Sequence, residues 1–420
     1  MALLFSEAFE STAGLGTDFW PIANRVGSLS TAIGRTNNAL VMPAANETNA
    51  SFRESSYITF DFGPLGTQTN KKLYLGFAAR GFKTKSGLSD GTFTDRQVFF
   101  RVLDGTKTET LSFEFEKNLD ANSTVLQLSA VKNNSVLHTF SLTSIPVAKY
   151  FGNCANGPNV VTQSTESTWY YFELELDLAA ATPTVKLWIN GLRATTTLGA
   201  NQFTVAGLTA VGGFQLHGAR YDVCRNGFSG APESVLFDDM YISDNANAAY
   251  NHQATTALTT RLGAAKVYSS TYSTGDAKNT NWSLAGSASN FADALAQPDG
   301  NEKYAASNIL TAELATRLSG PSSISNFERI AAIQMIYMAS AAGSLPTALM
   351  PIVDQNSAAA GLNVATDPDI FYPEEGYKTK ITTVQTDPVT NAAFTAPMLT
   401  ATGGTTVRRI GVKVAQVPKE

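Results

Sequence analysis

The chain has 420 residues, of which 43% are hydrophobic and 15% are charged, and its formal net charge is -5. The charged fraction is well below the roughly 25% of an ordinary globular protein, and this composition excludes a disordered chain and a coiled coil. It offers no basic face for nucleic acid, and its longest apolar runs, such as Ile330 to Met338, are far shorter than the roughly 20 residues of a membrane-spanning helix.

Short segments that alternate between apolar and polar residues dominate the chain from Leu3 to about Asp244. In the run that starts at Phe172, apolar and acidic residues take turns, so one face of the strand lies in a core and the other faces water. Asp104-Gly105 and Asn190-Gly191 follow two of the segments and tolerate the positive φ angles of hairpin turns. The predicted strands cover residues 57–62, 73–78, 97–103, 111–116, 124–129, 169–178, 184–189 and 234–242.

Many short strands with almost no helical pattern predict an all-β fold, with a concanavalin-like jelly-roll sandwich at residues 1–244. Residues 245–261 are small and polar without an apolar period and predict a linker. Residues 262–420 predict a second, smaller β-rich domain. Strands are expected there at 265–268, 381–384 and 407–414, and at 330–339, where a helical face also fits but the β-branched content favours a strand.

Several short blocks share their order with a known family of proteins. They are Phe5-Ser-Glu-Ala-Phe-Glu, Gly34-Arg35, Trp169-Tyr-Tyr-Phe-Glu-Leu-Glu-Leu, Val185-Lys-Leu-Trp-Ile-Asn-Gly, Phe237-Asp-Asp-Met-Tyr-Ile-Ser-Asp, Leu262-Gly, Lys266-Val, Thr280-Asn-Trp-Ser-Leu, Asn301-Glu-Lys-Tyr, Thr386-Asp-Pro-Val-Thr-Asn-Ala-Ala-Phe-Thr and Gly411-Val. In this order they resemble tailed-bacteriophage virion structural proteins, which have a concanavalin-like or laminin-G-like jelly roll and a β-rich C-terminal domain. Two blocks depart from that pattern: an acidic residue is replaced in Leu262-Gly-Ala, and a tryptophan is replaced by Phe394.

The resemblance implies a non-enzymatic structural component of a virion, as a tail, fibre or head-surface (capsid decoration) protein. Its partners would be other virion proteins and further copies of itself, with no nucleic acid and no membrane. A surface poor in charge fits this expectation, because it loses little hydration when it packs against identical neighbours. The N-terminus lacks the basic stretch of a secretory signal, so we expect synthesis in the host cytoplasm followed by assembly into the virion. The alternatives are a glycan-binding module for host attachment and a polysaccharide hydrolase.

Two pairs of carboxylates are the residues that an enzyme would use. Glu173 and Glu175 share one face of a strand about 7 Å apart, within the range that glycosidases need. Asp177 continues this row, which favours a solvated face over a catalytic pair. Asp238 and Asp239 are adjacent on a predicted strand, so we expect their side chains to point to opposite faces and not to share one substrate. The sequence therefore predicts no catalytic residue.

No cofactor or metal ligand is predicted either. Asp239 or Asp244 with loop carbonyls could bind Ca²⁺, but an aspartate that caps a turn is the more common arrangement. No nucleophile motif points to His138, His217 or His252, so we expect these histidines on the surface or as hydrogen-bonded core residues.

Cysteines and tryptophans complete the set of candidate residues. Cys154 and Cys224 are expected as two reduced thiols, with a disulfide as the open alternative. Four tryptophans could present a ring to a sugar, but two of them lie in strand patterns and are expected in the core. The four are Trp20 and Trp282 and, in the strands, Trp169 and Trp188.

Overall fold

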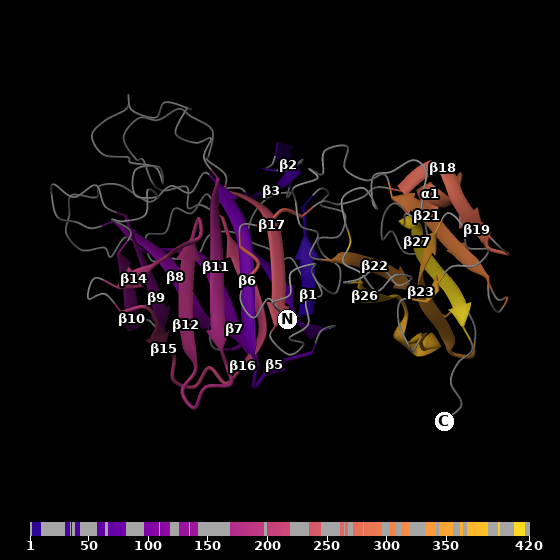
Figure 1. The fold of residues 1–420 in the computed structure, drawn as a ribbon. Coiled ribbons are helices and arrows are strands. Elements are labelled where there is room, and N and C mark those ends of the chain that lie inside the picture. The colour runs from indigo at the N-terminus through magenta and orange to yellow at the C-terminus, as the bar shows by residue number, and fades with distance from the viewer. Residues whose placement is uncertain are drawn as a thin grey trace, which may run out of the picture. The chain divides into compact units, whose positions relative to one another are not determined.

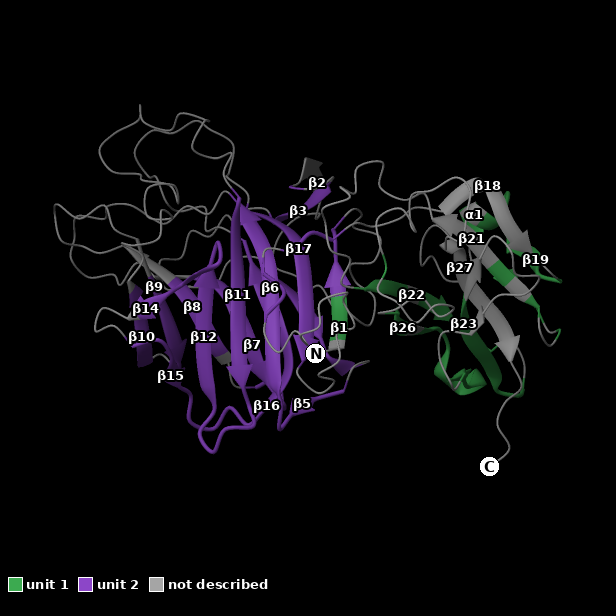
Figure 2. Ribbon diagram, in the orientation of Figure 1, with its two compact units in different colours: residues 1–5, 247–258, 268–420 green, residues 6–246, 259–267 purple. Residues whose placement is uncertain are grey.

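The computed structural model describes most of the predicted strands and part of the connections between them. The residues described are 2–9, 30–33, 35, 38–42, 57–63, 66–80, 96–108, 110–117, 126–133, 135–141, 169–196, 200–218, 235–244, 261–263, 265–267, 272–279, 281–295, 303–307, 309, 312–318, 332–341, 344–355, 362–363, 368–384, 394 and 407–415. The chain divides into two compact units (Figure 2). The sandwich unit comprises residues 6–246 and 259–267, and the second unit comprises residues 1–5, 247–258 and 268–420.

The first sheet of the sandwich unit has nine strands, most of them labelled in Figure 1. Its central strand β6 lies between β11 and β17. The order along the sheet is β13 (Leu192–Arg193), β12 (Thr184–Ile189), β11 (Tyr170–Asp177), β6 (Lys72–Arg80), β17 (Val235–Asp244), β3 (Asn38–Met42) and β2 (Ser30–Ile33), while β1 (Ala2–Glu7) pairs with β17 and β15 (Phe203–Thr204) with β12.

The second sheet has eight strands and faces the first. Its order is β14 (Thr195–Thr196), β10 (Ser135–Ser141), β9 (Leu126–Lys132), β8 (Thr110–Lys117), β7 (Arg96–Asp104), β16 (Ala210–His217) and β4 (Tyr57–Asp61), while β5 (Gln68–Thr69) pairs with β16. Neighbouring strands with a described register are antiparallel in both sheets.

Aromatic side chains fill the space between the two sheets. Phe77 and Phe172 of the first sheet stack with ring centroids 5.6 Å apart, and Phe99 of the second sheet lies 4.8 Å from Phe172. Phe77 also meets Phe100 of the second sheet edge to face at 5.3 Å. Such pairs add to the gain from burying apolar area. The predicted all-β, concanavalin-like jelly-roll sandwich is confirmed, and the strands predicted up to residue 244 are present.

The two predicted hairpin turns have different geometries. Asn190 and Gly191 both take positive φ, 50° and 79°, and Ile189 pairs with Leu192 around this two-residue turn. After Asp104 the turn is longer, because the next strand begins only at Thr110. There Lys107, with φ 62°, takes the left-handed conformation and donates its backbone N–H to the carbonyl oxygen of Asp104 at 3.0 Å. The short hairpin predicted at Asp104-Gly105 is therefore wrong.

The second unit is also built from antiparallel strands. Its main sheet has the order β18 (Tyr272–Asn279), β21 (Glu313–Leu318), β27 (Val407–Ala415), β23 (Thr347–Gln355) and β24 (Leu362–Asn363), and β25 (Asp369–Phe371) pairs with β23. The remaining elements are the pairs β19 (Ser283–Gly286) with β20 (Lys303–Ala306) and β22 (Ile333–Ala339) with β26 (Lys378–Val384), the helix α1 (Phe291–Leu295) and the 3₁₀ turn η4 (Pro373–Glu375).

A small core cluster of Ala312, Leu349 and Phe371 lies in the second unit, and Trp282 packs against it. The strand favoured for residues 330–339 is confirmed as β22 over Ile333–Ala339. The strand predicted for residues 265–268 is wrong, because residues 265–267 form no strand and belong to the sandwich unit. No helix in the part of the chain that the structure describes is long and apolar enough to cross a membrane.

Candidate functional site

The outer face of the first sheet, which points away from the core between the sheets, holds the carboxylates singled out in the sequence. Along β11 the side chains of Phe172, Leu174 and Leu176 fill the core, so Glu173 and Glu175 share the opposite face, as their spacing predicts. The register of β11 sets Glu173 between Gly76 and Trp188, and Glu175 between Tyr74 and Lys186. Each glutamate therefore has its own set of neighbours.

Glu173 is 1% exposed and is held by three donors. Its Oε1 accepts a hydrogen bond from the hydroxyl of Tyr241 at 2.8 Å and another from the backbone N–H of Gly263 at 2.8 Å, while Oε2 pairs with the guanidinium of Arg261. Burial, and then the nearby Glu173 carboxylate, raise the pKa of Tyr241 well above its usual value, so this phenol stays protonated and donates. The predicted solvated face is wrong for Glu173.

Gly76 leaves the space that the contact between Tyr241 and Glu173 needs. Tyr241 is on β17 and Glu173 is on β11, so the Tyr241 side chain reaches Glu173 across β6, where its cross-strand partner is Gly76. A Cβ atom at Gly76 would lie 2.1 Å from Cε1 and 2.8 Å from Cζ of the Tyr241 ring. Only glycine leaves room for the ring at this point.

Glu175 lies in a separate ion-pair network. Its Oε1 is 2.8 Å from Nζ of Lys186 and 4.0 Å from Nζ of Lys72, and Lys72 also pairs with Asp177 at 3.1 Å. Burial and the charges of Glu175 and Asp177 raise the pKa of the Tyr74 hydroxyl to about 12. The Glu173 and Glu175 carboxylates are thus each paired with a basic side chain, not turned toward a common substrate position.

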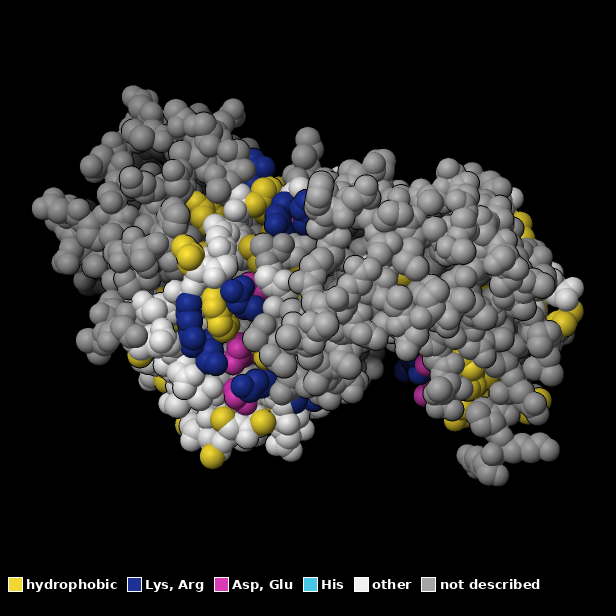
Figure 3. Space-filling model, in the orientation of Figure 1, with side chains coloured by type: hydrophobic (Ala, Val, Ile, Leu, Met, Phe, Trp, Pro, Cys, Tyr) yellow, Lys and Arg dark blue, Asp and Glu magenta, His cyan; other side chains and the backbone are white. Residues whose placement is uncertain are grey.

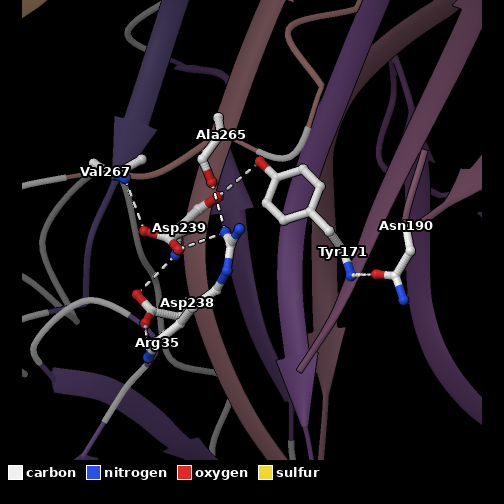
Figure 4. A network of polar contacts seen from close by, with 7 residues as sticks. All are labelled: Arg35, Tyr171, Asn190, Asp238, Asp239, Ala265 and Val267. Carbon is white, nitrogen blue, oxygen red and sulfur yellow. Dashed lines mark hydrogen bonds and ion pairs between the residues drawn. The ribbon is translucent and has the colours of Figure 1, made fainter. Parts of the chain in front are cut away.

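The Asp238 and Asp239 side chains share a partner, which corrects the prediction that alternation sends them to opposite faces of the strand. The register between β17 and β6 shifts from Asp238, opposite Ala78, to Tyr241, opposite Gly76, and Asp239 has φ 49°. This β-bulge breaks the alternation, so both carboxylates reach Arg35 (Figure 4). Asp238 Oδ2 accepts from the Arg35 backbone N–H at 2.6 Å, and Asp239 Oδ2 pairs with Arg35 Nη1 at 2.8 Å.

The same network holds residues of the sandwich unit that follow its last strand, β17, in sequence. Arg35 Nη1 donates to the carbonyl oxygen of Ala265 at 2.7 Å, and the Val267 N–H donates to Asp239 Oδ1 at 2.7 Å (Figure 4). The Tyr171 hydroxyl donates to the carbonyl oxygen of Asp239 at 3.0 Å. Together with the bonds from Arg261 and Gly263 to Glu173, these contacts tie residues 261–263 and 265–267 to the outer face of the first sheet.

The two aspartates considered as calcium ligands each pair with a basic side chain, which does not favour a calcium site. Asp239 pairs with Arg35, and Asp244, whose side chain is 3% exposed, pairs with Lys71 at 2.8 Å. Among the described residues no group of three or more His, Cys, Asp or Glu side chains is placed to hold a metal ion.

Trp188 lies on the outer face and not in the core, because Val185, Leu187 and Ile189 fill the inner positions of β12. The guanidinium groups of Arg261 and Arg193 lie 5.0 and 5.3 Å from the centre of its ring, within cation–π range. Figure 3 shows Lys and Arg side chains gathered with hydrophobic and acidic side chains on this face of the sandwich. The core position predicted for Trp188 is wrong, and its ring is already a partner of two arginines.

The outer face of the second sheet holds a cluster that the sequence did not point to, centred on His217. The His217 ring is fully buried beside the Tyr57 ring, with centroids 5.1 Å apart. Nε2 of His217 is 3.4 Å from Oε1 of Gln215, and Nδ1 has no hydrogen-bond partner. Burial, followed by the positive charge of Arg101, lowers the pKa of His217 well below its usual value. The imidazole is therefore neutral, and the hydrogen-bonded core histidine expected here is only partly satisfied.

His138 also differs from that expectation. Its ring stacks on Phe203 with centroids 4.8 Å apart, Nε2 lacks a partner, and burial lowers its pKa. Other residues singled out in the sequence, Cys154, Cys224, His252 and Trp20, lie outside the described residues, so the alternatives for the two cysteines stay open.

Comparison with known proteins gives distant likenesses of fold. No protein-family model matches the chain, and no curated protein matches it. An endo-β-1,4-glucuronan lyase from Trichoderma reesei is 15% identical, with 58% of this chain and 95% of that one covered and a TM-score of 0.29. An alginate lyase from Aplysia kurodai is 10% identical (58% and 99% covered, TM-score 0.30). Lectin I-B4 from Griffonia simplicifolia is 11% identical (57% and 99% covered, TM-score 0.30).

Proposed function

We propose that this chain is a non-enzymatic structural component of a tailed-phage virion. The sandwich unit would be a rigid module displayed on the particle, and the second unit would take part in attachment or in contacts between copies. The virion assignment is supported by the ordered sequence blocks, among them the one that begins at Trp169. The non-enzymatic assignment is supported by one structural observation: three donors already bond the buried carboxylate of Glu173.

A hydrolase with two carboxylates needs one of them free to donate a proton and the other free to attack or to activate water. Glu173 is buried and receives hydrogen bonds from Tyr241, Gly263 and Arg261. Glu175 is paired with Lys186. Displacing such partners from a buried carboxylate is costly, so we assign both glutamates to the stability of the sandwich.

Two measurements on the same preparation test this proposal. Mass spectrometry of gradient-purified particles should detect the chain in stoichiometric amounts, and its absence from the particles would contradict the virion assignment. The purified chain should release no reducing ends from host envelope polysaccharide. Turnover by the parent chain that is lost in both Glu173→Gln and Glu175→Gln would contradict the non-enzymatic assignment.

The second function to consider is glycan binding for attachment to the host. The observation that favours it is the polar outer face of the second sheet, where the partly exposed Gln215 and Arg101 are cross-strand partners. Trp188 is the weaker candidate for a sugar platform, because two guanidinium groups already lie over its ring.

A further inference from the structure

Six of the residues that follow β17 are bonded to the outer face of the first sheet at two anchors. They are residues 261–263 and 265–267, hereafter the strap. The first anchor is Glu173 on β11: the Gly263 N–H donates to its Oε1 at 2.8 Å, and the guanidinium of Arg261 pairs with its Oε2. One end of the strap is therefore held by a backbone hydrogen bond and by a pair of opposite charges.

The second anchor is Asp239 on β17. Its Oδ1 accepts a hydrogen bond from the Val267 N–H at 2.7 Å, and its Oδ2 pairs with Nη1 of Arg35 at 2.8 Å. The same Nη1 atom donates to the carbonyl oxygen of Ala265 at 2.7 Å. The other end of the strap is therefore held through one donor and one acceptor of its backbone.

Tyr171 joins the two anchors into one network. Its hydroxyl donates to the carbonyl oxygen of Asp239 at 3.0 Å. Burial, followed by the charges of Glu173 and Asp239, raises the pKa of Tyr171 well above its usual value, so the phenol lies within electrostatic reach of both carboxylates and stays protonated. The two ends of the strap are therefore bonded to one connected set of polar groups.

Polar contacts, and not apolar burial, hold the strap in place. All six of its residues are at least partly exposed, and residues 265–267 form no strand. The sandwich is held instead by buried aromatic side chains between its sheets, such as Phe77 and Phe172. Hydrogen bonds contribute little net stability where water can replace them, and segments with few buried apolar contacts open at a lower free energy than a core does.

Each anchor keeps a second partner when the strap leaves. Tyr241 donates to Glu173 Oε1 at 2.8 Å, and Arg35 pairs with Asp239. Neither Tyr241 nor Arg35 belongs to the strap. A buried carboxylate without any donor would be a large penalty, and opening of the strap avoids it at both anchors.

From these contacts we propose that the strap is a conformational device: it opens as one unit while the sandwich stays folded, and its opening frees the chain that leads into the second unit. Residues from 268 onward belong to that unit. The bonded strap fixes the point on the sandwich from which the chain departs. Once open, the seven positions from 261 to 267 add up to about 23 Å of reach. The inference goes beyond the proposed function, since it concerns a motion within the chain and holds with or without a virion role.

The test is hydrogen exchange of the full chain, read by mass spectrometry with fragmentation that separates Gly263 from Val267. In the parent, both amides should be at least tenfold less protected than those of β6 and β11. Asp239→Asn, which keeps a residue type that tolerates positive φ, should speed exchange at least fivefold at Gly263 as well as at Val267. Arg261→Gln, at the other end of the strap, should speed exchange at the same two amides.

Glu175→Gln is the matched control. Glu175 lies on the same face of β11 as Glu173, but its carboxylate pairs with Lys186 and Lys72 and not with the strap. Exchange of the strap amides in this variant should stay within twofold of the parent.

Three results would overturn the inference: strap amides as protected as those of β6 and β11, acceleration confined to the amide next to the substitution, or equal acceleration in Glu175→Gln. The β6 and β11 amides of each sample report whether the sandwich is folded, and Arg261→Gln, at a partly exposed position, serves if Asp239→Asn does not fold. Failure here is distinct from failure of the proposed function. A chain absent from virions whose strap opens would keep the inference, and a virion chain whose strap opens only by global unfolding would lose it.

Discussion

Replacing Gly76 by alanine perturbs the polar network of the first sheet at its narrowest point. The added Cβ atom would lie 2.1 Å from Cε1, 2.7 Å from Cδ1 and 2.8 Å from Cζ of the Tyr241 ring, all far inside contact distance. The ring must then leave its place across β6. Its hydroxyl would lose Glu173 Oε1, and the Leu262 N–H would lose that hydroxyl as acceptor.

The expected cost follows from these losses. A hydrogen bond to a charged group contributes about 1.5 to 3 kcal/mol, and a neutral one contributes about 1 kcal/mol. Overpacking a buried site costs about 1 to 3 kcal/mol, while replacing glycine inside a strand returns about 0.5 to 1 kcal/mol. Gly76→Ala should therefore lower the free energy of unfolding of the sandwich unit by about 3 to 6 kcal/mol, a large part of a typical domain's stability.

Urea unfolding of the full chain measures this change, with the transition of the sandwich unit assigned by hydrogen exchange in β6 and β11. In a Tyr241→Leu background, where the ring is gone, Gly76→Ala should cost less than about 1 kcal/mol, so the two substitutions should be strongly non-additive. Gly63→Ala is the matched control, because the nearest atom to its Cβ would be 3.4 Å away. A cost at Gly76 below about 1 kcal/mol, or full additivity with Tyr241→Leu, would refute the reasoning.

Three further predictions concern charged and titratable groups. In urea unfolding, Glu173→Gln should destabilise the sandwich by about 3 kcal/mol and Glu175→Gln by about 1 kcal/mol or less. The reason is that only Glu173 is paired inside a fully buried site. Equal costs of the two substitutions would contradict this reason. Burial and the charge of Arg101 lower the pKa of His217, so its contribution to stability should be complete above pH 6.5. Below that value the free energy of unfolding should fall by up to about 1.4 kcal/mol per pH unit. His217→Phe should remove this slope, and a variant with the same pH profile as the parent would contradict the prediction. Hydrogen bonds from Ser289 and Lys303 lower the pKa of Asp293 to about 2, so Asp293→Asn should speed amide exchange in α1 at pH 7, and parent-like exchange would contradict the role of this carboxylate.

The strands of the sandwich could be predicted because alternation is a local property. Phe172, Leu174 and Leu176 must share one face of β11 whatever the rest of the chain does, and their burial against the second sheet confirms this. The same logic gave the shared face of Glu173 and Glu175. It also predicts the two-residue turn at Asn190-Gly191, where both residues accept positive φ.

The polar networks could not be predicted, because they depend on contacts between residues far apart in the sequence. Arg35 and Asp239 are 204 positions apart, and Glu173 and Arg261 are 88 positions apart. A β-bulge adds one residue to a strand and leaves no mark in the amino-acid composition. Asp239 takes positive φ, but an aspartate signals that conformation less strongly than a glycine does. Gly76, inside an otherwise apolar strand, is a local signal of a close approach.

Trp188 shows a limit of the hydrophobicity argument. It was expected in the core because it lies in a strand with apolar neighbours, yet the alternation places it outward with Lys186. The cation–π contacts with Arg193 and Arg261 let a large aromatic ring remain on a charged face. Counting positions along β12 predicts the outcome better than hydrophobicity does.

Electron microscopy of purified particles, made with the gene present and with it deleted, tests the proposed function most directly. The proposal predicts that a defined, symmetric density is missing from the deleted particles and returns when the gene is supplied in trans. Particles that are fully assembled and indistinguishable from the parent would contradict the virion role.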